Sequence, residues 1–185
     1  MKHTSVKDMT FTALMAVIIA VCSWISLRIG SVPLTLQTFG VAASLCILGG
    51  KRGTAAIAVY ILLGLAGVPV FANFTGGAGV LFGMTGGYII GFLLMGAVYW
   101  LITSLFGNKP AATAAALAAG LVICYIFGTV WFMAVYSREK GDISLISALT
   151  MCVFPFIIPD ILKLTTAALL AGKMPSFIRA SRSEA

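Results

Sequence analysis

Long apolar runs, separated by short turns of polar residues and glycine, set the pattern of this sequence. The first run, residues 9–27, is as long as a helix must be to cross a hydrocarbon core of ~30 Å. Similar runs follow along the chain, although the second and third are short for a full crossing. We expect six transmembrane helices, at residues 9–27, 37–48, 54–65, 88–105, 111–136 and 143–170. The pattern therefore predicts an all-α membrane protein, a bundle of six transmembrane helices.

The composition supports this prediction and leaves little room for a second domain. Of the 185 residues, 61% are hydrophobic and 9% are charged, whereas soluble chains carry about 25% charged residues. No long polar segment remains, so we expect residues 1–185 to form a single integral membrane domain, with cytoplasmic tails at residues 1–8 and 173–185. The first run lacks a signal-peptide cleavage site, so we expect it to stay as a helix.

The basic residues indicate how the chain crosses the membrane. The net charge is +7, but Lys and Arg form no continuous basic face with interleaved aromatic residues, which argues against a nucleic-acid partner. Six crossings place Arg28, Arg138 and Lys140 on one side. The larger basic set falls on the other side and comprises Lys2, Lys7, Lys51, Arg52, Lys109, Lys173, Arg179 and Arg182. By the positive-inside rule, we expect both termini in the cytoplasm.

Residues 64–87 are too rich in glycine for one uninterrupted helix and too apolar for a solvated loop. Irregular backbone at membrane depth is tolerated only where it packs within protein or lines a cavity. Asn73 in this segment offers both a hydrogen-bond donor and an acceptor. Phe71, Phe74 and Tyr88 would add flat apolar surface. The segment is therefore a candidate wall of a binding site.

The glycines of this region allow two interpretations. They can let a ligand approach the backbone closely, or they can let two helices pack tightly. For Gly76, Gly77, Gly86 and Gly87 both alternatives stay open. For Gly91 and Gly96, in the following helix, we expect tight packing.

Asp160 and Lys163 form the one opposite-charge pair within an apolar run, and their spacing places both on one helix face. A charge near the bilayer centre costs at least ~2.5–3.5 kcal/mol, so such residues usually face the bundle interior and mark a functional site. The alternatives are an ion pair that only joins helices, or a lysine that reaches the membrane surface. In a binding site, Lys163 would be the counter-ion of an anionic ligand and Asp160 would accept from its N–H groups.

The remaining candidate chemistry is sparse. The single histidine, His3, lies in the N-terminal tail, and no phosphate-binding loop is present, so enzyme activity and ATP hydrolysis are not expected. No metal site is predicted, because the four cysteines lie singly in apolar runs and are interpreted as core residues: Cys22, Cys46, Cys124 and Cys152. In the first helix, small residues at Ala13, Ala16 and Ala20 would let another helix approach, from this chain or from a partner.

Four segments, taken in order, resemble the BioY family of biotin transporters. They are Val-Pro-Leu-Thr-Leu-Gln-Thr-Phe at residues 32–39, Leu-Ala-Gly-Val-Pro-Val-Phe-Ala at 65–72, Gly-Met-Thr-Gly-Gly-Tyr at 83–88 and Pro-Asp-Ile-Leu-Lys at 159–163. The third segment departs from the family, which usually has proline where Met84 stands. The resemblance covers nearly the whole chain.

This resemblance implies the substrate-capturing S component of an energy-coupling factor (ECF) importer in a prokaryotic plasma membrane. Its partners would be a transmembrane scaffold (T component) and two ABC ATPases, and its ligand would be biotin, with no cofactor. The first-helix residues Ala13, Ala16 and Ala20 would then face the scaffold. The residues implied for biotin binding are Asp160, Lys163, Asn73, Tyr88, Thr85, Gly86, Gly87, Gln37 and Phe71. An S component for another vitamin, or a structural membrane subunit without a transport role, remain the alternatives.

Overall fold

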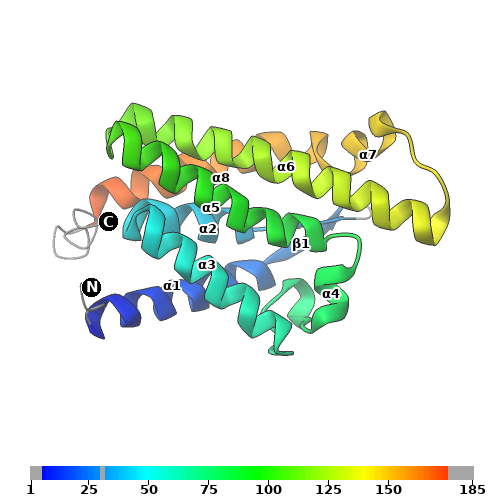
Figure 1. Ribbon diagram of the computed structural model, residues 1–185, viewed down its shortest axis with the longest axis horizontal. Helices are drawn as coiled ribbons and strands as arrows, with labels where there is room; N and C mark the ends of the chain where they lie inside the picture. The colour runs from blue at the N-terminus through cyan, green and yellow to red at the C-terminus, as the bar shows by residue number, and fades with distance from the viewer. Residues whose placement is uncertain (1–5, 30–31, 175–185) are drawn as a thin grey trace.

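The fold is a bundle of helices with one short hairpin, seen along its length in Figure 1. The computed structural model describes residues 6–29 and 32–174. In this part of the chain, four helices are long and apolar enough to span a membrane: α1 (Val6–Trp24), α5 (Gly86–Phe106), α6 (Pro110–Lys140) and α8 (Phe154–Lys173). The helices α2 (Gln37–Leu48) and α3 (Gly50–Leu65) are shorter and pack between them.

Small residues bring these helices close together. A Cβ added to Gly91 of α5 would lie 3.0 Å from Sγ of Cys124 in α6, and one added to Gly96 would lie 2.7 Å from Oγ1 of Thr54 in α3. The first contact is tighter than ordinary van der Waals contact, and the second leaves no room for a side chain. The packing role expected for these two glycines is confirmed.

The first helix ends earlier than expected and is followed by a β-hairpin. α1 ends at Trp24, and β1 (Ser26–Ile29) pairs in antiparallel fashion with β2 (Val32–Thr35), with Ser26 opposite Thr35. The backbone N–H of Leu36 donates to the carbonyl of Ile25 at 3.0 Å and closes the hairpin. The prediction that the helix continues to residue 27 is therefore wrong. The hairpin pairs the backbone N–H and C=O groups that another helical turn would have paired.

The last expected helix, residues 143–170, is two helices. α7 (Leu145–Cys152) and α8 meet at Val153, whose φ of −125° and ψ of −56° interrupt the helix. Pro155 explains the break, because proline lacks an N–H and fits only the first turn of a helix. Pro159 lies within α8.

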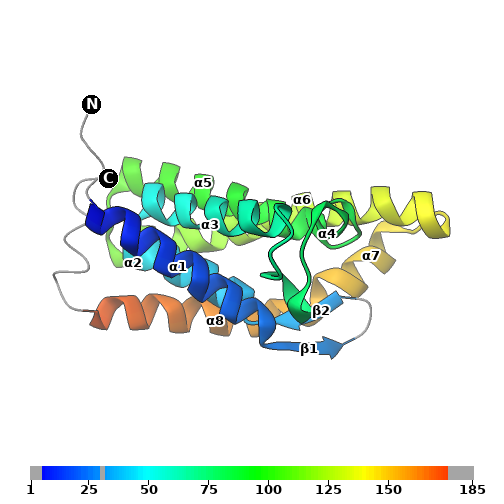
Figure 2. The ribbon, with the colours of Figure 1, turned by 90° about the horizontal axis from the view of Figure 1, so that it is seen from below.

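Residues 64–87 form an irregular segment, as their glycine content predicted. A short 3-10 turn, η1 (Ala72–Phe74), and the short α4 (Ala78–Phe82) lie between α3 and α5. Asn73 and Phe74 both have a φ of 57°, an uncommon backbone conformation for residues other than glycine. This segment folds back toward the hairpin at one end of the bundle, as Figure 2 shows. The start of α1 and the end of α8 lie at the other end.

Candidate functional site

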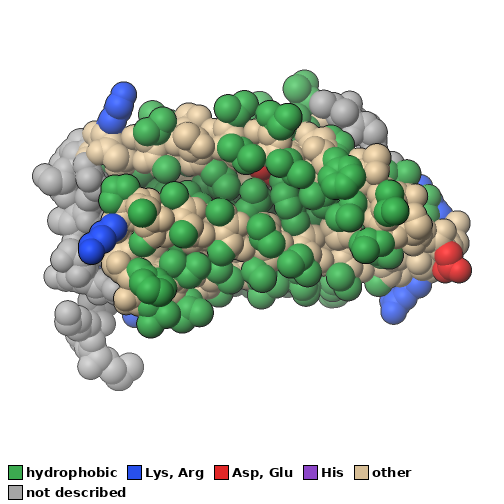
Figure 3. All heavy atoms as spheres, turned by 90° about the horizontal axis from the view of Figure 1, so that it is seen from above, with side chains coloured by type: hydrophobic (Ala, Val, Ile, Leu, Met, Phe, Trp, Pro, Cys, Tyr) green, Lys and Arg blue, Asp and Glu red, His purple; other side chains and the backbone are tan. Residues whose placement is uncertain are grey.

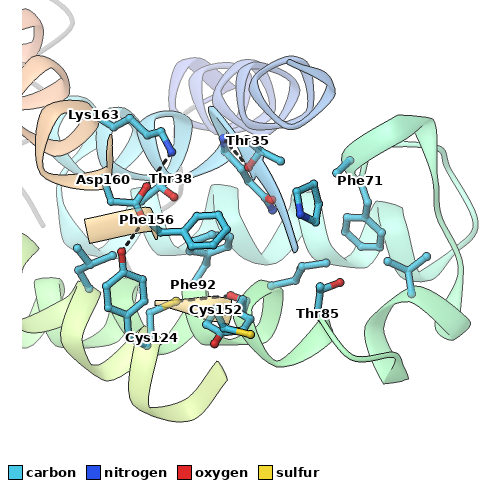
Figure 4. Close-up of a pocket in the computed structure, with 18 of the residues that line it drawn as sticks. Thr35, Thr38, Phe71, Thr85, Phe92, Cys124, Cys152, Phe156, Asp160 and Lys163 are labelled. Atoms are coloured by element: carbon cyan, nitrogen blue, oxygen red, sulfur yellow. Dashed lines mark hydrogen bonds and ion pairs between the residues drawn. The ribbon is translucent and has the colours of Figure 1, made fainter. Parts of the chain in front are cut away.

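A cavity of about 290 Å³ lies inside the bundle, between the hairpin, the η1 turn and helices α5, α6 and α8. Figure 4 shows its lining side chains, with Asp160 and Lys163 at one end and Phe71 and Thr85 at the other. The volume is close to the ~300 Å³ lower bound of typical small-molecule sites. The cavity is therefore large enough for a ligand of vitamin size.

The Asp160–Lys163 ion pair of α8 lies at one end of the cavity. Nζ of Lys163 lies 2.7 Å from Oδ1 of Asp160, and the hydroxyl of Tyr125 donates to Oδ2 of Asp160 at 2.7 Å. Asp160 is 3% exposed and Lys163 is 9% exposed. Both carboxylate oxygens are thus engaged, which offsets part of the cost of burying this charge. The pair forms a net neutral polar group with a donor side and an acceptor side.

The middle of the cavity is mostly apolar. Phe92 of α5, Leu121 of α6 and Phe156 of α8 line it, and Phe156 lies beside the ion pair in Figure 4. Such walls favour an apolar ligand body by removing its surface from water. A ligand that fits this site has a polar end and an apolar centre.

The hairpin and the η1 turn form the other end. Asn73 lines the cavity from η1, and the Ser26 hydroxyl of β1 donates to its side-chain oxygen at 3.4 Å. The ring of Phe74 stacks on Trp24 at the end of α1, with centroids 5.0 Å apart. These contacts tie the glycine-rich segment to the hairpin. They hold Asn73 and Phe74 beside the hairpin and the end of α1.

Most of the residues expected in the site meet at this cavity. The ion pair of α8 meets the glycine-rich segment and the start of α5, although it is far from them in sequence. The expected residues that line it are Gln37, Phe71, Asn73, Thr85, Tyr88, Asp160 and Lys163. Besides the ion pair and Asn73, two of these side chains have partners inside the protein. The amide of Gln37 donates to the hydroxyl of Tyr60 at 2.8 Å, and the hydroxyl of Tyr88 lies 3.0 Å from Oγ1 of Thr129.

Gly86 and Gly87, also expected in the site, are not among the residues that line the cavity. A Cβ on Gly86 would overlap the carbonyl of Leu81, and one on Gly87 would overlap the side chain of Trp131. Trp131 also donates from Nε1 to the carbonyl of Gly83 at 3.1 Å. The two glycines therefore serve packing between the start of α5 and its neighbours.

Two of the three small residues of the first helix pack within this chain, which was one of the two alternatives for them. Ala16 is 1% exposed and Ala20 is 5% exposed, because α1 packs there against α2 and α3. Their side chains belong to the core of this chain and do not form a partner surface in this structure. Ala13, one turn earlier, is exposed.

Sequence reasoning missed several residues of the cavity. Tyr125 is the most important, since it binds Asp160 across 35 residues of sequence. Cys124 and Cys152, interpreted only as core residues, also line the wall. Tyr125 stands near the middle of the apolar run at residues 111–136, and a hydroxyl at that depth needs a partner. That signal could have identified it.

These features define a class: a helical membrane protein with an internal binding cavity for a small molecule. The family model for the BioY family matches residues 1–180. "Biotin transporter BioY" of Thermotoga maritima is 44% identical over 172 residues, covering 91% of this chain and 94% of that protein. "Probable biotin transporter BioY" of Pyrococcus horikoshii is 36% identical over 168 residues, covering 91% of this chain and 96% of that protein. The chain belongs to the BioY family.

A solved structure agrees with this assignment. The crystal structure of the S-component for biotin from an ECF-type ABC transporter matches with a TM-score of 0.78 and 25% identity. The match covers 90% of this chain and 89% of that chain. The helical bundle described above is therefore of the ECF S-component type.

Proposed function

We propose that this protein captures biotin for uptake, as the substrate-binding S component of an ECF-type importer. It is a transport subunit rather than an enzyme. The names of the BioY relatives and the solved biotin S-component support the cargo. The observation that carries the proposal is the buried Asp160–Lys163 pair at the end of an otherwise apolar cavity.

The proposal includes the setting of the protein. The chain is a single multi-pass domain of a prokaryotic plasma membrane and crosses it six times, with α7 and α8 together as the sixth crossing. Residues 1–8 and 173–185 are its cytoplasmic tails. A transmembrane scaffold and two ABC ATPases supply the ATP chemistry, and biotin binds without a cofactor. The similarity to the S-component structure supports this arrangement.

Biotin fits the chemistry of the cavity. Its ureido group presents N–H donors beside a carbonyl acceptor, its ring and aliphatic chain are apolar, and its carboxylate is charged. The cavity offers a buried ion pair at one end, aromatic and aliphatic walls in the middle, and polar side chains such as Asn73 and Thr85 at the other end. Each part of the ligand thus meets a matching part of the cavity.

The geometry of the pair limits how biotin can lie. The carboxylate and the ureido group are at opposite ends of an extended biotin molecule, whereas Asp160 and Lys163 are 2.7 Å apart. The expected roles, with Lys163 on the carboxylate and Asp160 on the ureido group, therefore cannot both hold. We place the ureido group at the pair, since its N–H groups match Asp160 and its carbonyl matches Lys163. A ligand carboxylate there would face the like charge of Asp160.

Ligand-dependent stability tests the cargo. A ligand that binds only the folded state raises the free energy of unfolding by about 2.7 kcal/mol when its free concentration is 100 times its Kd. Excess biotin should therefore raise the melting temperature of the purified protein, measured by scanning fluorimetry in detergent. No shift with biotin would overturn the proposal. A shift with a different vitamin would keep the transport role and replace the cargo.

Biotinamide, which lacks the carboxylate charge, tests the orientation. With the ureido group at the ion pair, Lys163→Ala should weaken biotin and biotinamide by the same factor, measured by calorimetric titration. A much larger loss for biotin would instead place the carboxylate at Lys163. Lys51→Ala is the matched control, because Lys51 is exposed and does not line the cavity.

A further inference from the structure

A second cavity, of about 610 Å³, lies between α6 and α8 and shares no lining residue with the biotin cavity. It runs along the first turns of α6 and the second half of α8, at the end of the bundle where α8 ends. Its lining includes Ala114, Leu117 and Ala118 on one side and Ile161, Leu164, Ala168 and Leu169 on the other. We call this cavity the α6–α8 groove.

The groove faces the surroundings of the bundle. Ala114 and Ala118 on α6, and Ile161 and Leu169 on α8, are exposed although they belong to helices apolar enough to span a membrane. Figure 3 shows the face that carries α6 and α8: hydrophobic side chains are spread along its length, and Lys and Arg side chains appear only at its two ends. In a bilayer, hydrocarbon chains cover such a face.

One end of the groove is polar and basic. Asn108 lines it, and the exposed Lys109 is its chain neighbour. Across the groove, the exposed Lys173 directly follows the lining residue Gly172. None of the groove's lining residues is acidic. The groove therefore matches an anionic phospholipid: its apolar walls suit the hydrocarbon chain, and the two lysines at its end suit the negatively charged headgroup.

We propose that the α6–α8 groove binds one acyl chain of an anionic phospholipid, whose phosphate lies near Lys109 and Lys173. Basic sites between transmembrane helices attract anionic headgroups, and each lysine near the membrane surface contributes about 1 kcal/mol. A phospholipid is favoured over a protein helix because the two lysines match its headgroup and the bilayer supplies it at this face. This site is separate from biotin capture.

Native mass spectrometry of the delipidated full chain tests the proposal. The probes are palmitoyl-oleoyl phosphatidylglycerol and phosphatidylcholine, which share acyl chains and differ in headgroup charge. After the lipids are added, the protein should bind one molecule of phosphatidylglycerol and should bind phosphatidylcholine more weakly. Replacing Lys109 or Lys173 by Gln should weaken phosphatidylglycerol by about fivefold for each lysine. Lys51→Gln, at an exposed lysine outside the groove, should leave binding unchanged.

A groove-filling variant tests the chain-binding part. Ala118→Trp should abolish retention of both lipids, whereas Ala115→Trp should not, because Ala115 is exposed on the same helix but does not line the groove. Far-ultraviolet circular dichroism checks that both variants keep their helices. Equal lipid retention by the two tryptophan variants would overturn the proposal. A lipid-free dimer peak that Ala118→Trp removes and Ala115→Trp keeps would also overturn it, since the groove would then hold a second copy of the chain.

Discussion

At the residue scale, the Asp160 carboxylate connects stability and binding. It accepts from Lys163 and from Tyr125, each at 2.7 Å, within helices that span the membrane. Removing either partner would leave a buried polar group unsatisfied. The resulting loss of folding stability would exceed the net stabilisation that the intact pair provides. The pair therefore holds Lys163 and Tyr125 in fixed positions at the end of the cavity. A ligand meets groups that are already oriented.

Asp160→Ala separates the two roles. The change leaves the Lys163 ammonium buried without its carboxylate, so we expect a loss of about 3–5 kcal/mol in stability and a large drop in melting temperature without biotin. Adding Lys163→Met removes the unpaired charge and should restore most of the stability, yet neither variant should bind biotin. Asp142→Ala is the control, since Asp142 lies exposed in the loop before α7. An unchanged melting temperature for Asp160→Ala would contradict this account.

The sequence was informative about these residues to different degrees. Asp160 and Lys163 could be identified because charges three residues apart in an apolar run are rare and costly. Tyr125 was missed because its partner lies 35 residues away, and the pairing of α6 with α8 cannot be derived from periodicity. Gly86 and Gly87 were expected in the site only through the family resemblance, because their glycine-rich surroundings left ligand contact and packing equally open. Which atoms a glycine approaches depends on packing, and here Leu81 and Trp131 fill that space.

At the element scale, short irregular elements form one end of the cavity and long helices form the rest. β1, β2 and η1 bring Pro33, Thr35 and Asn73 over the space between α5 and α8. Polar and apolar residues alternate over only four positions after α1, at Ser26–Ile29. So short a stretch is also compatible with one more helical turn, and for this reason the hairpin was not predicted. The break at Val153 had a clearer local cause in Pro155. Prolines mark possible breaks, but tertiary packing decides which of them ends a helix.

The start of α5 gives a test of element packing. Gly87→Ala places a methyl group where the side chain of Trp131 lies, so we expect overpacking to lower stability by about 1–3 kcal/mol. The melting temperature without ligand measures this loss. Gly79→Ala in α4 is the matched control, because a Cβ there meets open space. That change should be neutral or slightly stabilising, since alanine favours a helix over glycine. Equal effects of the two changes would contradict a packing role for Gly87.

At the scale of the whole molecule, the two ends of the bundle differ. One end carries Lys7, Lys51, Arg52, Lys109 and Lys173, together with the start of α1 and the end of α8. The other end carries the hairpin and the loop after α6. α6 has 31 residues and at 1.5 Å per residue is about 46 Å long, which exceeds a hydrocarbon core of ~30 Å. We therefore expect its last turns, with Arg138 and Lys140, to project beyond the membrane.

This asymmetry predicts the orientation of the protein in the membrane. The positive-inside rule places the more basic end in the cytoplasm, so the biotin cavity lies nearer the outer face and the α6–α8 groove nearer the inner leaflet. Single cysteines at Glu139 and at Lys51, both exposed, report on the two ends, because the four native cysteines are buried. A membrane-impermeant maleimide should label Glu139→Cys in intact cells, and Lys51→Cys only after the membrane is opened. The reverse labelling pattern would contradict this orientation. Biotin would then enter its cavity from the cytoplasm, which is incompatible with capture for uptake.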